Sequence, residues 1–225
     1  MYKSILELKN KHKNEDIWVV LGGSSMDYVS DSFFKNKIVL GINQVFRHYS
    51  CDYILMKDCM EEPRFPRAIR ELEELDIPLI YTKHYAGHYK LQENVVSYKN
   101  SYMCNHSDND RRIDGALEVI GTDVMACVRS TITTMMNIAA YMGAKNIISC
   151  GVDCGTINNN LYYDGYTEKD WKSAGNWGGV SGWISSTHDD NIQVRNKITE
   201  IYGCNIYSLN PFMNFQLDGN EYKPC

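Results

Sequence analysis

One histidine in this chain is placed for acid–base chemistry. His188 precedes the acidic pair Asp189 and Asp190, directly before a helical pattern over 191–202. The positive end of a helix dipole disfavours an imidazolium, so this placement predicts a neutral ring at pH 7 that could accept a proton. The structural alternative is a polar loop histidine with no chemical role.

Two segments have the residue types that bind anions. Gly22, Gly23 and Ser24 follow an apolar run, where glycines let backbone N–H groups approach a phosphate. This loop is neither G-x-G-x-x-G nor a P-loop, and an ordinary strand-to-helix turn explains it equally. Arg129, Ser130 and Thr131 open a helical pattern, and a cation with hydroxyls at a helix start suits an anionic ligand. Either hydroxyl could instead cap the helix.

Polar side chains also follow two other predicted strands. Asn43 comes after the run 38–42, where an amide could read a base or ribose edge or could cap a helix. Asp153 follows the run 146–150, at the strand end where doubly wound folds keep ligands. Asp108 and Asp110 match the D-x-D pattern that holds a divalent ion, but no apolar strand leads into them. We therefore expect a solvated loop there and no metal site.

The elements that position these residues alternate in type. Helical periodicity is clearest at 67–75, 131–142 and 191–202, between the apolar runs. The alternation predicts an α/β fold, a Rossmann-like, mostly parallel sheet flanked by helices, as a single domain over 1–225. The runs predicted as short buried strands are 17–21, 38–42, 53–56, 79–81, 146–150 and 205–208.

An aromatic-rich insertion near 155–187 separates a predicted strand from the last helix. Long loops of this kind are commonly lids or binding loops, and the alternative is an insertion with its own aromatic core. Its tryptophans and tyrosines are Trp171, Trp177, Trp183, Tyr162, Tyr163 and Tyr166.

Composition limits the class of protein. With 225 residues, 44% hydrophobic and 23% charged, the chain is a folded globular protein. A net charge of −5 disfavours general binding to nucleic acid or anionic membranes. The run 17–21 is far shorter than the roughly 20 residues that span a bilayer, and the charged residues before it do not form a signal peptide. We therefore expect a cytoplasmic protein with reduced cysteines, two of which, Cys127 and Cys150, lie in a predicted helix and strand.

Taken together, six motifs resemble the bacterial sialyltransferases of glycosyltransferase family 42. They also resemble the wider Rossmann-like group that includes flagellin-glycosylation and pterin pyrophosphokinase-like domains. The resemblance covers most of the chain in islands, and the helix–strand segment before G-V-D is its most specific part. The motifs are V-L-G-G-S-S, G-I-N-Q-V-F, the segment from R-S-T-I-T-T to S-C-G-V-D, N-L-Y-Y-D, S-T-H-D-D-N and S-L-N-P.

The resemblance implies a metal-independent, inverting transfer from a CMP-linked sugar to a glycan or other hydroxyl acceptor, with no cofactor. It also implies a role for each matching position. His188 matches the general base, Tyr162 or Tyr163 a phosphate-binding tyrosine, Asn43 a nucleotide-contacting amide, Gly22 to Ser24 the first nucleotide loop, Thr131 the donor-facing helix start, and Asn210 the amide of the closing motif. The family commonly has Asn and Pro in its first loop, where this chain has Gly23 and Ser24.

Three other functions fit the same pattern. One is an ATP-dependent pyrophosphokinase-like enzyme, which would need the carboxylates and a metal. Another is a non-catalytic nucleotide- or glycan-binding protein. The third is a viral enzyme that glycosylates modified DNA bases, although the acidic charge argues against it. For the leading hypothesis we expect no membrane span, no general nucleic-acid binding, and a homo-oligomer by analogy alone.

Overall fold

The structure of the chain is a computed structural model. It describes residues 2–56, 64–82, 98–107, 112–153, 157–158, 160, 162–166 and 180–209. Within these ranges no helix is both long and apolar enough to cross a membrane.

All six predicted strands are present. Three further strands escaped prediction because two are only a pair of residues long and the third contains Asn105 and His106 in place of an apolar run. The predicted six are β2 (Asp16–Val20), β3 (Ile38–Ile42), β4 (Tyr53–Met56), β5 (Leu79–Thr82), β8 (Asn146–Cys150) and β9 (Asn205–Ser208), and the additional three are β1 (Lys3–Ser4), β6 (Ser101–His106) and β7 (Val124–Met125).

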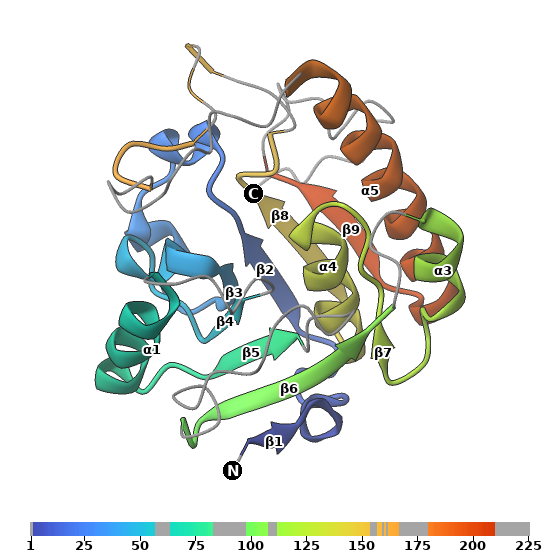
Figure 1. The fold of residues 1–225 in the computed structure, drawn as a ribbon, viewed down its shortest axis with the longest axis horizontal. Coiled ribbons are helices and arrows are strands. Elements are labelled where there is room, and N and C mark those ends of the chain that lie inside the picture. The colour runs from blue at the N-terminus through green and yellow to red at the C-terminus, as the bar shows by residue number, and fades with distance from the viewer. Residues whose placement is uncertain are drawn as a thin grey trace.

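The strands form a nine-stranded sheet in the order β1-β6-β5-β4-β3-β2-β8-β9, with β7 beside β6. Every described pair is parallel, which confirms the predicted α/β class. From β2 the chain builds outward through β3, β4, β5 and β6, then returns to place β8 on the other side of β2 (Figure 1). Open sheets bind ligands at such a reversal, outside the carboxyl ends of the strands.

Helices cover both faces of this sheet, and each strand divides its side chains between them. Ile54 and Met56 of β4 belong to the buried cluster that contains Leu72, a residue of α1 (Arg64–Leu75). Tyr53 and Leu55, which alternate with them, belong to the larger cluster that includes the core residues of the last two helices. The remaining described helices are α3 (Ile113–Glu118), α4 (Thr131–Tyr141) and α5 (Val180–Tyr202), with 3-10 turns η1 (Ile5–Leu8), η2 (Ser24–Tyr28), η3 (Asp31–Phe34) and η4 (Asn43–Arg47).

The last helix is longer than predicted. α5 begins at Val180, whereas the apolar periodicity indicated a start near Asn191. The expected insertion over 155–187 therefore overlaps the first turns of α5, and residues 155–156, 159, 161 and 167–179 of it lie outside the described residues. Buried polar residues over 187–191 interrupt the apolar stripe, which is why periodicity could not find this part of the helix.

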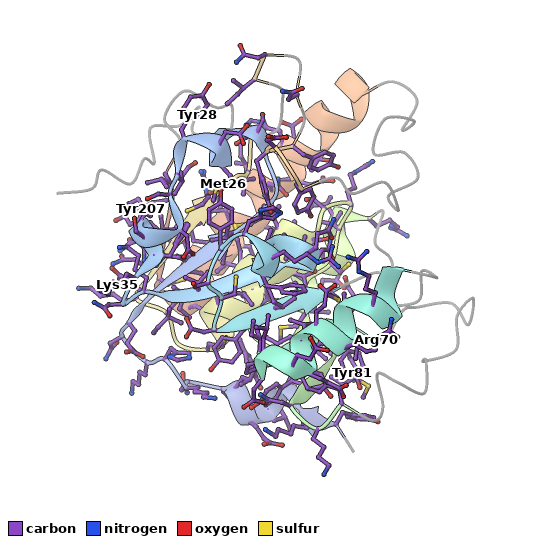
Figure 2. The ribbon with its side chains drawn as sticks, turned by 90° about the vertical axis from the view of Figure 1, so that its left-hand side faces the viewer. Met26, Tyr28, Lys35, Arg70, Tyr81 and Tyr207 are labelled. Atoms are coloured by element: carbon purple, nitrogen blue, oxygen red, sulfur yellow. The ribbon has the colours of Figure 1, made fainter. Side chains whose placement is uncertain are left out.

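The 3-10 turn after β2 begins with buried residues and ends with exposed ones. Met26 of η2 is fully buried, while Tyr28 is 69% exposed and projects from the surface (Figure 2). The described cysteines are free thiols. One detail of the cysteine prediction is wrong: Cys127 is buried in the loop before α4, because the helix begins only at Thr131.

Candidate functional site

The loops after β2 and β8 run side by side at the carboxyl edge of the sheet. The pairing of the two strands continues beyond their ends, because Leu21 N donates to Cys150 O at 2.9 Å and Gly23 N donates to Gly151 O at 3.0 Å. Gly151 has a φ of +70°, and a Cβ at this position would lie 2.4 Å from Leu21 O. Only glycine allows the two loops to approach so closely.

Asp153 lies at the predicted strand end, and its carboxylate holds the first loop. Its Oδ2 accepts a hydrogen bond from Ser25 N at 2.7 Å, and its Oδ1 accepts one from Ser25 Oγ at 2.5 Å. Ser24 Oγ lies 3.5 Å from Oδ2. The side chain is only 4% exposed. Asp153 therefore positions the loop after β2 through contacts within the protein.

The two glycines of this loop are required by protein packing. A Cβ at position 22 would lie 2.5 Å from the ring of Tyr166, and a Cβ at position 23 would lie 2.4 Å from Gly151 O and 2.6 Å from the Asp153 carboxyl. The sequence had suggested that these glycines make room for a ligand phosphate. In the structure the side-chain space beside Gly22 contains the Tyr166 ring.

A short segment, Tyr162 to Tyr166, lies over the loop after β2, and we call it the tyrosine strap. Tyr163 N donates to Gly22 O at 3.1 Å, and Asp164 N donates to Asp27 Oδ1 at 2.8 Å. Gln44 Nε2 of η4 donates to Tyr166 O at 3.0 Å. Sequence reasoning placed Gln44 after a predicted strand and Tyr166 in the aromatic insertion. It missed their contact, because nothing in the local pattern indicates that two segments so distant in the chain meet.

The two predicted phosphate-binding tyrosines of the strap have different surroundings. Tyr163 is 3% exposed, and its ring packs edge-on against His48 and Tyr49 at centroid distances of 5.2 and 5.6 Å. Its hydroxyl has no hydrogen-bond partner among the described residues, and burial raises the pKa of Tyr163 well above its usual value. Tyr162 stacks on Tyr166 at 5.1 Å and is only partly buried. Of the two, Tyr162 is the more accessible to a ligand.

Asn43 follows β3 as expected, at the strand beside β2. It is the first residue of η4 and has a φ of +49°, while Ile42 is the N-cap. The alternative that Asn43 caps a helix is therefore wrong. Its half-buried side chain makes no hydrogen bond with any described residue, which leaves the amide available to a ligand.

Residues 129–131 open α4 as predicted. Ser130 is the N-cap, its side chain makes no capping hydrogen bond, and Thr131 begins the helix. The first N–H groups of a helix have no partner within it, so such a start presents donors. Because α4 leads into β8 and runs antiparallel to it, these donors lie at the carboxyl edge of the sheet. Arg129, just before the cap, forms an ion pair from its Nε to Asp190 Oδ2 at 2.6 Å.

His188 lies within α5 and not before it. The structure thus corrects the dipole argument, because the helix begins at Val180 and His188 is past its first two turns. The residue is 8% exposed, and its Nδ1 lies 3.5 Å from Asp189 Oδ1. The Arg129–Asp190 pair holds this turn of α5 against the start of α4. Burial raises the pKa of Asp190, an effect that the hydrogen bond and charge of Arg129 oppose.

Three residues of the sequence interpretation lie outside the described residues: Asn210, Asp108 and Asp110. In the described part of the chain, no group of three His, Cys, Asp or Glu side chains is arranged to hold a metal ion. The described site therefore offers a buried histidine, one arginine, a free amide, helix N–H donors and a tyrosine. These groups can bind an anion and transfer a proton.

No protein-family model and no curated protein sequence matches this chain. Solved structures do match. The sialyltransferase CstII from Campylobacter jejuni, solved with the substrate analogue CMP-3FNeuAc, aligns with a TM-score of 0.57 at 14% identity, over 93% of this chain and 86% of that chain. The monofunctional α-2,3-sialyltransferase Cst-I from the same organism aligns with a TM-score of 0.53 at 12% identity, over 94% and 83%. The chain therefore shares the fold of the bacterial sialyltransferases that its motifs resemble.

Proposed function

We propose that this chain is a glycosyltransferase that moves a sugar from a CMP-linked donor, of the sialic-acid type, to a hydroxyl group of a glycan or other acceptor. One observation carries the proposal. The Arg129–Asp190 ion pair, at 2.6 Å, brings the turn of α5 that contains His188 to the start of α4. This is the carboxyl edge of the sheet, where folds with this topology bind ligands. The fold shared with sialyltransferases supports the choice of donor.

Each group has a defined part in the proposed reaction. His188 accepts the proton of the acceptor hydroxyl as that oxygen attacks the anomeric carbon. The bond between this carbon and the phosphate oxygen breaks, the electron pair stays on the phosphate, and the configuration inverts. The Tyr162 hydroxyl and the N–H groups at Thr131 donate hydrogen bonds to the phosphate as its charge develops. Asn43 contacts the nucleotide, and no metal takes part.

The proposal is tested by following transfer from CMP-sialic acid to a lactose acceptor, with and without EDTA. We expect turnover that EDTA leaves unchanged. Replacing His188 by Ala should lower kcat by about 100-fold or more, the usual contribution of a general base, while the Kd for CMP stays within about threefold of the wild-type value. His12→Ala is the matched control, because His12 lies in the loop before β2, with its Nε2 3.0 Å from the Tyr53 hydroxyl.

Two results would contradict the proposal. If turnover requires a divalent ion, the metal-free mechanism is wrong, and the reaction uses carboxylates and a metal instead. Equal loss of CMP binding and turnover in His188→Ala would make His188 a structural residue of α5.

A further inference from the structure

The guanidinium of Arg129 is bonded to the protein only through its Nε, among the described residues. Its Nε bonds Asp190, while its terminal nitrogens, Nη1 and Nη2, make no hydrogen bond with any described residue. The Arg129 side chain is 36% exposed, whereas that of Asp190 is 11% exposed. A guanidinium is planar and its donors have a fixed fork geometry. An acceptor at Nε therefore also sets the direction in which the Nη edge points.

The backbone at this position is unusual as well. Arg129 has a φ of +47°, and every other non-glycine residue with a positive φ is Asn or Asp among those that the structure describes. Ser130 N donates to Val128 O, which closes a tight turn around Arg129. This turn places the arginine side chain directly before the uncapped N-terminus of α4. The ion pair and the turn together orient the guanidinium.

We propose that Asp190 is a positioning residue for Arg129. By holding Nε, it directs the Nη edge so that this edge and the open N–H groups of α4 receive an oxyanion of the ligand. The identity of that oxyanion, the donor phosphate or a sugar carboxylate, rests on the proposed function. Asp190 does not touch the ligand and acts only through Arg129.

Positioning and simple electrostatics make opposite predictions here. Asp190 carries a negative charge next to the anion site, so its removal alone would strengthen anion binding. If Asp190 orients Arg129, its removal weakens anion binding although the site becomes more positive. Both side chains carry rotamer freedom, and an arginine without its partner must lose that freedom when the ligand binds. The sign of the change therefore identifies the role.

The test compares the Kd values of CMP and cytidine by calorimetry. Asp190→Asn and Asp190→Ala should raise the Kd of CMP by about tenfold, the loss of one charge-assisted contact, and leave that of cytidine within about twofold. Arg129→Ala should behave similarly, and the double variant Arg129→Ala/Asp190→Ala should show no further loss. Asp189→Asn is the charge-matched control, because the Asp189 side chain is 72% exposed and its Oδ1 lies 3.5 Å from His188 Nδ1.

A parallel comparison of N-acetylneuraminic acid with its amide identifies the anion. A selective loss for the acid, with CMP unaffected, places the sugar carboxylate at Arg129 and supports the proposal through that group. Tighter binding of both anions in Asp190→Asn, or equal losses for CMP and cytidine, overturns it. If the wild type binds none of these ligands, the proposed function fails. The inference is then tested with inorganic phosphate. Phosphate should raise the unfolding temperature of the wild type, and this stabilisation should disappear in both Arg129→Ala and Asp190→Ala. A wild type that phosphate does not stabilise overturns the inference.

Discussion

At the scale of single residues, the buried carboxylate of Asp153 connects the two loops that form the edge of the site. It accepts hydrogen bonds from the backbone and the side chain of Ser25. The sequence predicted a ligand-binding residue at this strand end, whereas the structure shows the Asp153 carboxylate bonded to Ser25 of the first loop. The distance of the partner along the chain is the reason that spacing alone could not identify it.

We expect Asp153→Ala to lower the free energy of unfolding by about 2–4 kcal/mol, because a buried N–H and a hydroxyl lose a charged acceptor. Urea denaturation measures this. Asp27→Ala is the control: Asp27 accepts an exposed bond from Asp164 N, and its loss should cost about 1 kcal/mol or less. Equal costs for the two variants would contradict the positioning role of Asp153.

A second residue-scale prediction compares two buried tyrosines. The Tyr49 hydroxyl donates to Met26 O at 2.8 Å, whereas the Tyr163 hydroxyl has no partner among the described residues. Tyr49→Phe should therefore destabilise the protein by about 1 kcal/mol, and Tyr163→Phe should be neutral or stabilising. Thermal unfolding with transfer assays tests both. If Tyr163→Phe loses transfer activity without losing stability, the hydroxyl that binds the phosphate belongs to Tyr163 rather than Tyr162.

At the scale of elements, the tyrosine strap and the loop after β2 are packed against each other through Gly22. A Cβ at position 22 would contact the far end of the Tyr166 ring, whereas one at Gly115 in α3 meets nothing within 4 Å. Gly22→Ala should therefore destabilise the protein by about 1–3 kcal/mol, and Gly115→Ala should stabilise it by about 0.5–1 kcal/mol, because glycine is a poor helix former.

The double variant Gly22→Ala/Tyr166→Ala separates this contact from other effects. If the ring causes the strain, the double variant costs less than the sum of the two single changes. Strict additivity would show that the Tyr166 ring does not cause the strain at position 22.

At the scale of the whole molecule, burial of tyrosine hydroxyls links stability to alkaline pH. Desolvation raises the pKa of both Tyr49 and Tyr98 from the usual 10 to about 12. The folded protein therefore keeps these protons where the unfolded chain releases them. This contribution to stability is fully present below pH 10 and is lost as the pH rises from 10 to 12.

Urea midpoints measured across pH 8 to 12 should fall above pH 10, and less steeply in the variant Tyr98→Phe. Tyr98 donates to Ile77 O at 2.6 Å, so the variant should also be less stable at pH 8. The control Tyr28→Phe changes a side chain that is 69% exposed and should leave the pH profile unchanged. An unaltered slope in Tyr98→Phe would exclude this tyrosine from the alkaline transition.

The sequence by itself determined the class of the fold and the edge of the sheet where the candidate site lies. Buried parallel strands are continuous apolar runs, and polar residues at their ends stand out, so 38–42 and 146–150 identified Asn43 and Asp153. The resemblance to sialyltransferases, based on short motifs, was confirmed at the level of the fold.

Only the tertiary structure decided how the site is assembled. Packing set the start of α5 earlier than its apolar periodicity indicated. Two contacts join segments far apart in the chain: Tyr166 with Gly22, and Arg129 with Asp190. Such contacts depend on the order in which the strands neighbour one another, with β8 returning to the side of β2. Local propensity and periodicity contain no information on that order, because they act over a few residues, whereas these contacts are set by packing across the whole sheet.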